Sequence, residues 1–287
     1  MAFDMDDLTM CLAGLRDDPF SCRAGDFDEM LQATEAEGFR GISLWAMHAR
    51  LLAEDGLSTK DIARRCDSHG LQVRVVEIEH VGGWPRADRA GIDAEIRPVF
   101  ELAAQLGAED VLAFTYEEAP VDLDDAARGF SYLCDLAARH GLRVGLEFLP
   151  WSGIADLDAA WSIVARAARE NGGLVVDTWH SQRQAGGLHL ETLRAVPPEH
   201  IHLVQLSDAP AEAHGSLMEE TMVHRLLPGD GDIDIRGILG TLEAMGAEPL
   251  LAPEVFNREL AARGPREAAR RMAHATRRVL AAVEADG

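Results

Sequence analysis

Short apolar runs alternate with longer amphipathic segments along the whole chain, and this alternation limits the folds open to it. Eight runs are rich in valine, isoleucine and leucine, as expected for parallel strands buried on both faces. Strands that alternate with helices form parallel sheets, so the pattern predicts an α/β fold. The expected strands are Leu8–Leu15, Gly41–Ala46, Leu71–Ile78, Asp110–Thr115, Leu142–Phe148, Gly173–Asp177, Ile201–Leu206 and Pro249–Phe256.

The segments between these runs have helical periodicity and recognisable ends. One helix is predicted by apolar residues at helical spacing from Phe27 to Thr34. A second opens with Ser58 as its candidate N-cap and closes with Gly70 as its candidate C-cap. Eight such units in 287 residues, with no evident linker, predict one (β/α)8 TIM barrel over residues 1–287.

An open doubly wound sheet is the structural alternative. That fold would place a glycine-rich phosphate turn after the first strand. The sequence there is GLRDDPFSCRAG, which does not contain GxGxxG. The closed barrel is therefore the preferred prediction.

Composition excludes several classes of partner. The formal net charge of −22 repels nucleic acid and anionic membranes, and no run approaches the length of a membrane helix. The acidic start MAFDMDDLTM does not resemble a signal peptide. The four cysteines form no CxxC pair, so we expect reduced thiols in a cytoplasmic protein: Cys11, Cys22, Cys66 and Cys134. A homo-oligomer is compatible with the sequence.

One segment, residues 208–231, is predicted to be an extended loop after the seventh strand. It is too long for an ordinary βα turn, and loops at that end of a barrel usually carry function. Asp208, at its start, is expected to hold a ligand or to hold the loop in place.

Oxygen-bearing side chains end the last four predicted strands. The active site of a (β/α)8 barrel lies at the carboxyl ends of its strands, which are about 4.8 Å apart. Carboxylates gathered there repel one another, and a magnesium, manganese or calcium ion would relieve that repulsion. A helix cap or a salt bridge would explain any one of them, and spacing alone leaves both interpretations open. The residues are Glu147, Asp177, Gln205 and Glu254.

The motifs LEFLP, VVDTWH, VQLSDAP, HRLLPGDG and PEVFN resemble those of the xylose isomerase-like barrel superfamily, the sugar phosphate isomerases and epimerases. The resemblance implies that Glu147, Asp177, Gln205 and Glu254 bind one divalent metal ion. Magnesium, manganese or cobalt is expected, with zinc as a further option. Tagatose- and psicose-type epimerases have histidine in place of Gln205. Endonuclease IV shares the barrel but needs more histidines and three zinc ions.

Glutamine at position 205, with the motifs around it, is closer to the bacterial 3-dehydroshikimate dehydratases of this superfamily. The resemblance implies a divalent-metal-dependent lyase that acts on a hydroxylated cyclic ketone through a metal-stabilised enolate. The alternatives are an isomerase or epimerase of a sugar or polyol ketone, and a non-catalytic ligand-binding barrel. The expected partner is a small-molecule substrate.

Five further residues are candidates for the chemistry. His180 and His80 are the expected acid–base residues, unless they cap a helix or lie on a surface loop. The resemblance implies that Arg225 binds substrate, and a planar guanidinium suits a carboxylate; a loop salt bridge is the alternative. His224 is expected to contact substrate or to pack the loop, and Trp45 to wall the pocket or to pack a helix.

Overall fold

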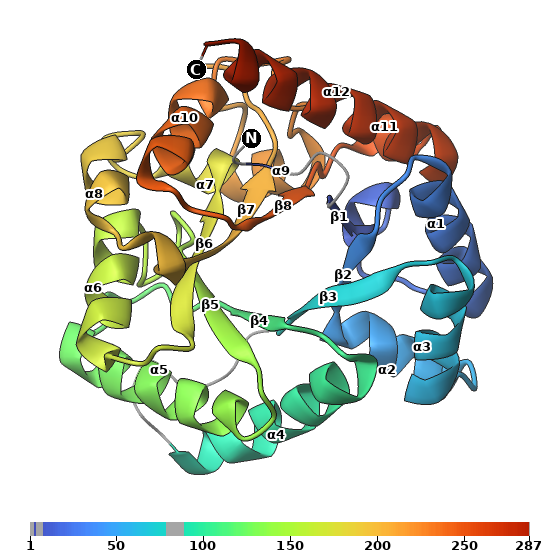
Figure 1. The fold of residues 1–287 in the computed structure, drawn as a ribbon, viewed down its shortest axis with the longest axis horizontal. Helices are drawn as coiled ribbons and strands as arrows, with labels where there is room; N and C mark the ends of the chain where they lie inside the picture. Colours follow the sequence, from blue (N-terminus) through green and yellow to red (C-terminus); the bar gives the residue numbers. More distant parts are fainter. Residues whose placement is uncertain (1–2, 4–7, 79–88, 287) are drawn as a thin grey trace.

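The computed structural model describes residues 3, 8–78 and 89–286. Its eight strands are parallel and lie in chain order in one sheet, with helices around them (Figure 1). An isolated parallel bridge between Leu8 and Leu251 joins the two ends of the sheet. The TIM-barrel prediction is confirmed. The strands are β1 Thr9–Cys11, β2 Gly41–Trp45, β3 Gln72–Glu77, β4 Asp110–Ala113, β5 Arg143–Glu147, β6 Gly172–Asp177, β7 Ile201–Leu206 and β8 Leu250–Pro253.

Capping residues mark the ends of α3. The Ser58 hydroxyl accepts a hydrogen bond from Asp61 N–H at the start of α3, so the predicted N-cap is confirmed. The C-cap is His69, and Gly70, predicted for that position, follows it with the left-handed φ of 65° that ends the helix. The helices are α1 Ala24–Ala36, α2 Ala46–Glu54, α3 Thr59–Ser68, α4 Arg89–Leu106, α5 Leu123–Ala138, α6 Leu157–Ala167, α7 Thr178–Arg183, α8 Leu190–Ala195, α9 Leu217–Val223, α10 Ile235–Met245, α11 Arg258–Ala261 and α12 Pro265–Asp286.

Most predicted strands extend one or two residues too far, and the first and the last are at least four residues too long. β1 ends at Cys11, and a buried 3-10 turn, Leu12–Leu15, continues the apolar run. β8 ends at Pro253, so Glu254 lies one residue beyond it. Apolar sequence reports burial rather than extended backbone, and both segments stay buried after the strand has ended.

Every second strand residue points into the barrel. An apolar layer inside it is formed by Val75, Leu112, Val175, Leu203, Leu250 and Ala252. The residues two positions after four of these are polar, so strand geometry aims them inward above an apolar floor. They are Glu77, Asp177, Gln205 and Glu254.

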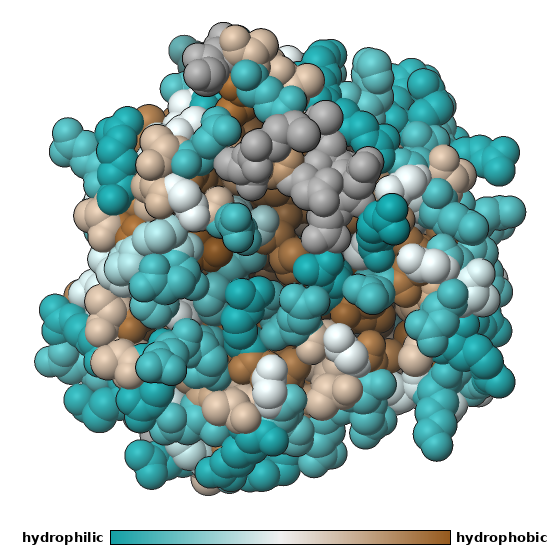
Figure 2. Space-filling view, in the orientation of Figure 1, coloured by the Kyte–Doolittle hydropathy of each residue, from teal (hydrophilic) through white to brown (hydrophobic). Residues whose placement is uncertain are grey.

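The surface agrees with the acidic composition. Figure 2 shows that hydrophilic residues cover most of the periphery of one face, with hydrophobic residues visible between them nearer its middle. Among the described residues, none of the helices combines the length and the apolar character that crossing a membrane would require.

The segment 208–231 is more regular than predicted, because it contains α9. Its two ends are held together by Asp208, whose carboxylate accepts hydrogen bonds from the backbone N–H groups of Ala209, Gly229 and Ile233 at 2.8, 2.9 and 3.0 Å. Asp208 also forms an antiparallel bridge with Leu226. Of its two expected roles, these contacts match that of holding the loop in place.

We expect the substitution Asp208→Ala to lower the free energy of unfolding by about 2–4 kcal/mol, because three buried N–H donors lose their acceptor. Urea unfolding followed by circular dichroism measures this. The control is Asp230→Ala in the same loop, which removes only an exposed ion pair with Arg278 and should cost less than about 1 kcal/mol. Equal midpoints for the two variants would contradict this role.

Candidate active site

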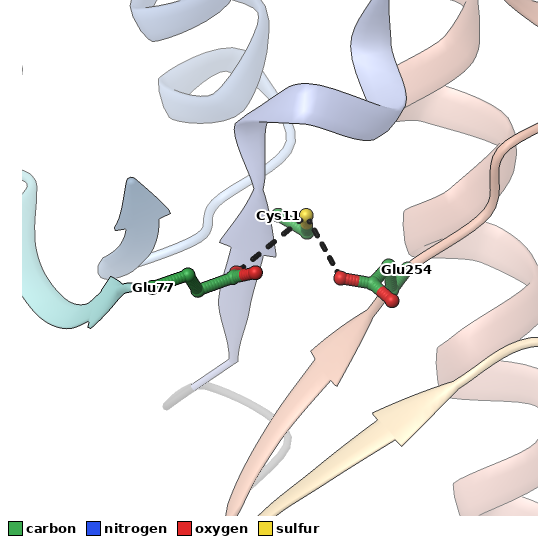
Figure 3. A group of neighbouring side chains, drawn as sticks. All are labelled: Cys11, Glu77 and Glu254. Carbon is green, nitrogen blue, oxygen red and sulfur yellow. Dashed lines mark hydrogen bonds between the residues drawn. The ribbon is translucent and has the colours of Figure 1, made fainter. Parts of the chain in front are cut away.

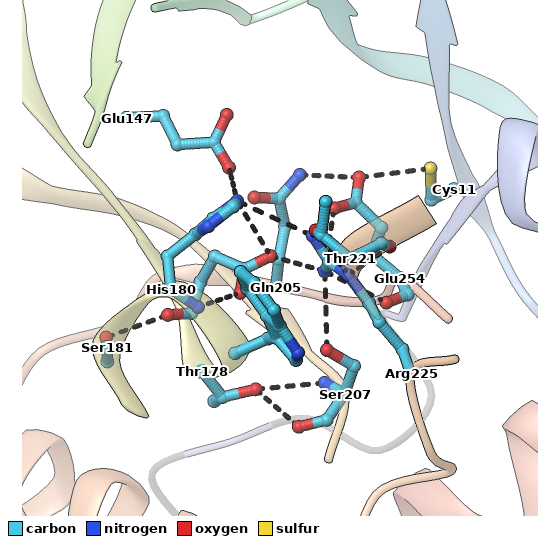
Figure 4. Close-up of polar contacts among 12 residues, drawn as sticks. Cys11, Glu147, Thr178, His180, Ser181, Gln205, Ser207, Thr221, Arg225 and Glu254 are labelled. Atoms are coloured by element: carbon cyan, nitrogen blue, oxygen red, sulfur yellow. Dashed lines mark hydrogen bonds and ion pairs between the residues drawn. The ribbon is translucent and has the colours of Figure 1, made fainter. Parts of the chain in front are cut away.

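The four predicted ligands converge at the carboxyl ends of β5 to β8. Glu147 and Asp177 are the last residues of β5 and β6, Gln205 is the penultimate residue of β7, and Glu254 follows β8. All four are buried. Figure 4 shows Glu147, Gln205 and Glu254 directed toward a common region from different strands. The structure therefore confirms the convergence that strand order alone predicted.

Two other side chains connect these four. Arg225 Nη1 donates to Asp177 Oδ2 at 2.7 Å and to Glu254 Oε2 at 3.2 Å. His180 Nε2 lies 3.4 Å from Glu147 Oε1 and 3.9 Å from Asp177 Oδ2. Glu254 Oε1 in turn accepts a hydrogen bond of 2.8 Å from Gln205 Nε2. The six side chains thus form one continuous buried network (Figure 4).

Several contacts hold Arg225 within this network. Its Nε donates to the Thr221 carbonyl at 3.0 Å and its Nη2 to the Thr221 hydroxyl at 2.8 Å, and the residue is only 2% exposed. Its guanidinium also lies over the rings of Trp179 and Phe256. The resemblance implied that Arg225 binds substrate, with a salt bridge as the alternative. In the structure it pairs with the site's own carboxylates and also lines the cavity, so its contact with substrate stays a prediction.

The charges of the site perturb one another. Burial raises the pKa of Asp177, but the Arg225 guanidinium and His180 outweigh it, so the pKa lies below its ordinary value. Burial raises the pKa of Glu254 well above its ordinary value; Arg225 opposes this and Glu77 adds to it. One guanidinium therefore does not neutralise all the carboxylates around it.

A cavity of about 330 Å³ opens onto this network. Trp45 lines it and stacks on His48, with ring centroids 5.4 Å apart, so its predicted place in the pocket wall agrees with the structure. His224 is absent from the described lining and packs edge-on against His214, and its predicted contact with substrate stays a prediction. His80 lies outside the described residues. The lining is Phe20, Trp45, Met47, Glu77, Ile78, Phe114, Tyr116, Glu147, Leu149, Trp151, His180, Met218, Thr221, Met222, Arg225, Glu254 and Phe256.

Two residues of the site were not predicted. Glu77 ends β3, lines the cavity and accepts a hydrogen bond from the Ser43 hydroxyl. The Cys11 thiol donates to Glu254 Oε1 at 3.3 Å and lies 4.0 Å from Glu77 Oε1 (Figure 3). The signal for Glu77 was present in LQVRVVEI, where a carboxylate also follows an apolar strand. No sequence signal marked Cys11.

The donor set fits a divalent cation. Glu147, Asp177 and His180 each offer a ligand atom, and these three atoms lie within 4.8 Å of one another. Gln205 Oε1 is buried and has no hydrogen-bond partner among the described residues, and a buried acceptor left in that state is costly. Oxygen and imidazole donors suit magnesium, manganese, cobalt or zinc.

The fold and the site thus define a TIM barrel with buried oxygen ligands at the carboxyl ends of its strands. Residues 31–278 match the xylose isomerase-like TIM barrel family. The chain therefore belongs to that family, as its motifs predicted.

Named relatives point to two reactions. The chain is 32% identical over 241 residues to a 3-dehydroshikimate dehydratase of Pseudomonas aeruginosa, covering 82% of this chain but only 37% of that protein. It is 27% identical over 175 residues to an inosose isomerase of Bacillus velezensis, covering 58% of this chain and 61% of that protein. The chain thus spans little more than a third of the length of the dehydratase.

A solved structure shares the whole barrel. The IOLI protein, solved with a zinc atom bound, superposes with a TM-score of 0.81 at 21% identity and covers 96% of this chain and 99% of its own. At that identity, the likeness shows the fold.

Without metal, the protein should lose stability as the pH rises toward neutrality. Burial, opposed by the Ser43 hydrogen bond and aided by Glu147, raises the pKa of Glu77 from 4.5 to about 7. A carboxyl group whose pKa is higher in the folded state stabilises the fold fully below about pH 4.5, and this is lost as the pH passes 7. We expect a loss on the order of 3 kcal/mol between pH 5 and 8, measured by urea unfolding in a chelator. Glu77→Gln should remove this part of the slope; an unchanged slope would contradict it.

Proposed function

We propose that the protein is a divalent-metal-dependent lyase of 3-dehydroshikimate-dehydratase type, which removes water from a hydroxylated cyclic ketone. The observation that carries this proposal is the convergence of Glu147, Asp177, Gln205 and Glu254 beside a cavity that also holds His180. The likeness to the Pseudomonas dehydratase supports the choice of reaction.

The metal ion would act as a Lewis acid toward the substrate carbonyl. Its ligands would be Glu147, Asp177, Gln205 and Glu254. Arg225 holds Asp177 and Glu254 in place by its hydrogen bonds to both, and its charge favours their ionised forms. It thereby prepares two ligands before an ion binds.

His180 is placed to move the proton that the reaction needs. Asp177 Oδ1 accepts a hydrogen bond from the His180 backbone N–H at 2.9 Å, so the first turn of α7 is fixed to the same residue that ends β6. Trp151 and Trp179 pack against the imidazole with ring centroids 5.3 Å away. The ring is thus oriented toward the cavity, and we assign it the role of base that removes the α-proton.

The cavity suits a small molecule with both apolar and polar groups. Aromatic side chains from several separate segments of the chain line it, together with acidic groups and His180. Apolar walls with a few convergent polar groups are usual for small-molecule sites. We propose a small-molecule substrate as the partner, and a reducing compartment such as the cytoplasm, because all four cysteines are free and buried.

An inosose-isomerase-type reaction is the second candidate. The chain covers 61% of the Bacillus velezensis isomerase, a larger share than it covers of the dehydratase. Both reactions begin with removal of a proton beside a carbonyl group. They differ in whether a hydroxyl group then leaves or a proton returns to carbon.

Metal binding is tested by thermal unfolding. Manganese at 100 times its dissociation constant should stabilise the folded protein by about 2.7 kcal/mol, because it binds only the assembled site. Glu147→Gln should raise the manganese concentration needed for the same stabilisation at least tenfold. The control Glu199→Gln, an exposed residue beside the start of β7 at the opposite end of the barrel, should bind like the unaltered protein. A stoichiometry of zero for the unaltered protein would refute the metal site.

Activity is tested with 3-dehydroshikimate and manganese. We expect protocatechuate to accumulate, visible by its ultraviolet absorbance, and a chelator to abolish its formation. His180→Asn should lower kcat by about 10²–10⁴-fold, the range of a lost proton-transfer group. If no protocatechuate forms but an inosose is isomerised, as followed by proton NMR, the second candidate replaces the first.

A further inference from the structure

One acidic residue of the cavity has no part in the predicted metal site. Glu77 enters from β3, on the side of the barrel opposite to β6 and β7 in the strand order. It lines the same cavity as Glu147, His180 and Glu254 and is 6% exposed. Burying a carboxyl group costs free energy of folding, so the position of Glu77 needs an explanation.

The neighbours of Glu77 are hydrogen-bond donors rather than cations. Ser43 Oγ donates to its Oε1, and the Cys11 thiol lies 4.0 Å from the same oxygen (Figure 3). Among the described residues, it forms no ion pair within 4.0 Å, whereas Asp177 and Glu254 both pair with Arg225. Its environment is thus that of a carboxyl group which is oriented but not neutralised.

Cys11 separates Glu77 from the metal ligands. Its thiol donates to Glu254 Oε1 at 3.3 Å and occupies the space between the two carboxylates. Burial raises the pKa of Cys11 well above its ordinary value, and the two glutamates add to this, so the sulfur keeps its proton. Cys11 therefore stands between Glu77 and Glu254 as a hydrogen-bond donor.

We propose that Glu77 is the second catalytic proton-transfer residue of the site, the acid that protonates the departing hydroxyl group. This inference rests on the proposed dehydration. An elimination needs a base at the α-carbon and an acid at the leaving oxygen. His180 and Glu77 line the same cavity, from the start of α7 and from the end of β3, so a substrate bound there would have both groups in its walls.

The step is balanced. His180 takes the α-proton, and the electron pair of that C–H bond is first held as the enolate of the neighbouring carbonyl group. The carbonyl group then re-forms as this pair makes the new carbon–carbon double bond and the bond from the β-carbon to its hydroxyl breaks. Glu77 gives its proton to the departing hydroxyl, which leaves as water. His180 then returns a proton to solvent and Glu77 regains one, so the enzyme is restored without an oxidant or reductant.

The experiment compares Glu77→Gln with the unaltered manganese-loaded enzyme and with the control Glu199→Gln. Three quantities are measured: protocatechuate formation, bound manganese by elemental analysis, and exchange of the substrate α-proton in D₂O by NMR. We expect Glu77→Gln to lose at least about 100-fold in kcat, with bound manganese and KM changed less than about threefold. Proton exchange should continue in this variant, because His180 is intact, and should be lost in His180→Asn.

The other outcomes are distinguishable. Glu77→Gln with full kcat overturns the role of Glu77 and leaves the dehydratase proposal standing. Loss of manganese together with loss of exchange makes Glu77 a ligand or a structural residue and overturns the inference. An unaltered enzyme that forms no protocatechuate removes the proposed function and this inference with it. Urea unfolding at pH 5 checks that the variant folds, since glutamine replaces a carboxyl group that is protonated there.

Discussion

The repulsion among carboxylates buried at one end of the barrel is the constraint on which the rest of the site depends. Parallel strands bring their carboxyl ends together, so inward-facing residues of β3, β5, β6 and β8 meet whatever their charge. Three of the four predicted ligands are acidic, and Glu77 is a fourth carboxyl group nearby. Such a cluster is stable only if cations, protons or hydrogen bonds compensate it.

The long segment after β7 supplies part of that compensation. Asp208 closes its ends, α9 fills its middle, and Arg225 follows α9 into the site. The buried Glu220 accepts hydrogen bonds from Trp179 Nε1 and Arg183 Nε, which fastens α9 to α7. A loop that carries the counter-charge of the site must be held this firmly, because a displaced Arg225 would leave Asp177 and Glu254 buried without a cation.

Strand order and the period of two made much of this predictable. Glu147, Asp177, Gln205 and Glu254 were identified from the sequence because each closes an apolar run, and their convergence follows from barrel geometry. The same rule applies to Glu77, which also ends an apolar run and was not predicted. The partners of Arg225 could not be predicted, since they depend on how residues 208–231 fold back. Cys11 was equally hidden, because the run containing it was interpreted as a longer strand.

The two reactions of the named relatives diverge after the α-proton has been removed, and both need acid–base groups beside the substrate. An isomerase of a hydroxyketone returns the proton to a neighbouring carbon and also moves protons between two oxygens, so an acid beside a hydroxyl group serves it as well. A dehydratase needs that acid, placed apart from the base so that both reach one substrate at once. Glu77 and His180 reach the cavity from β3 and from the start of α7, three strands apart in the order of the sheet. In the proposed dehydration, that separation lets one residue take the α-proton while the other protonates the departing hydroxyl group.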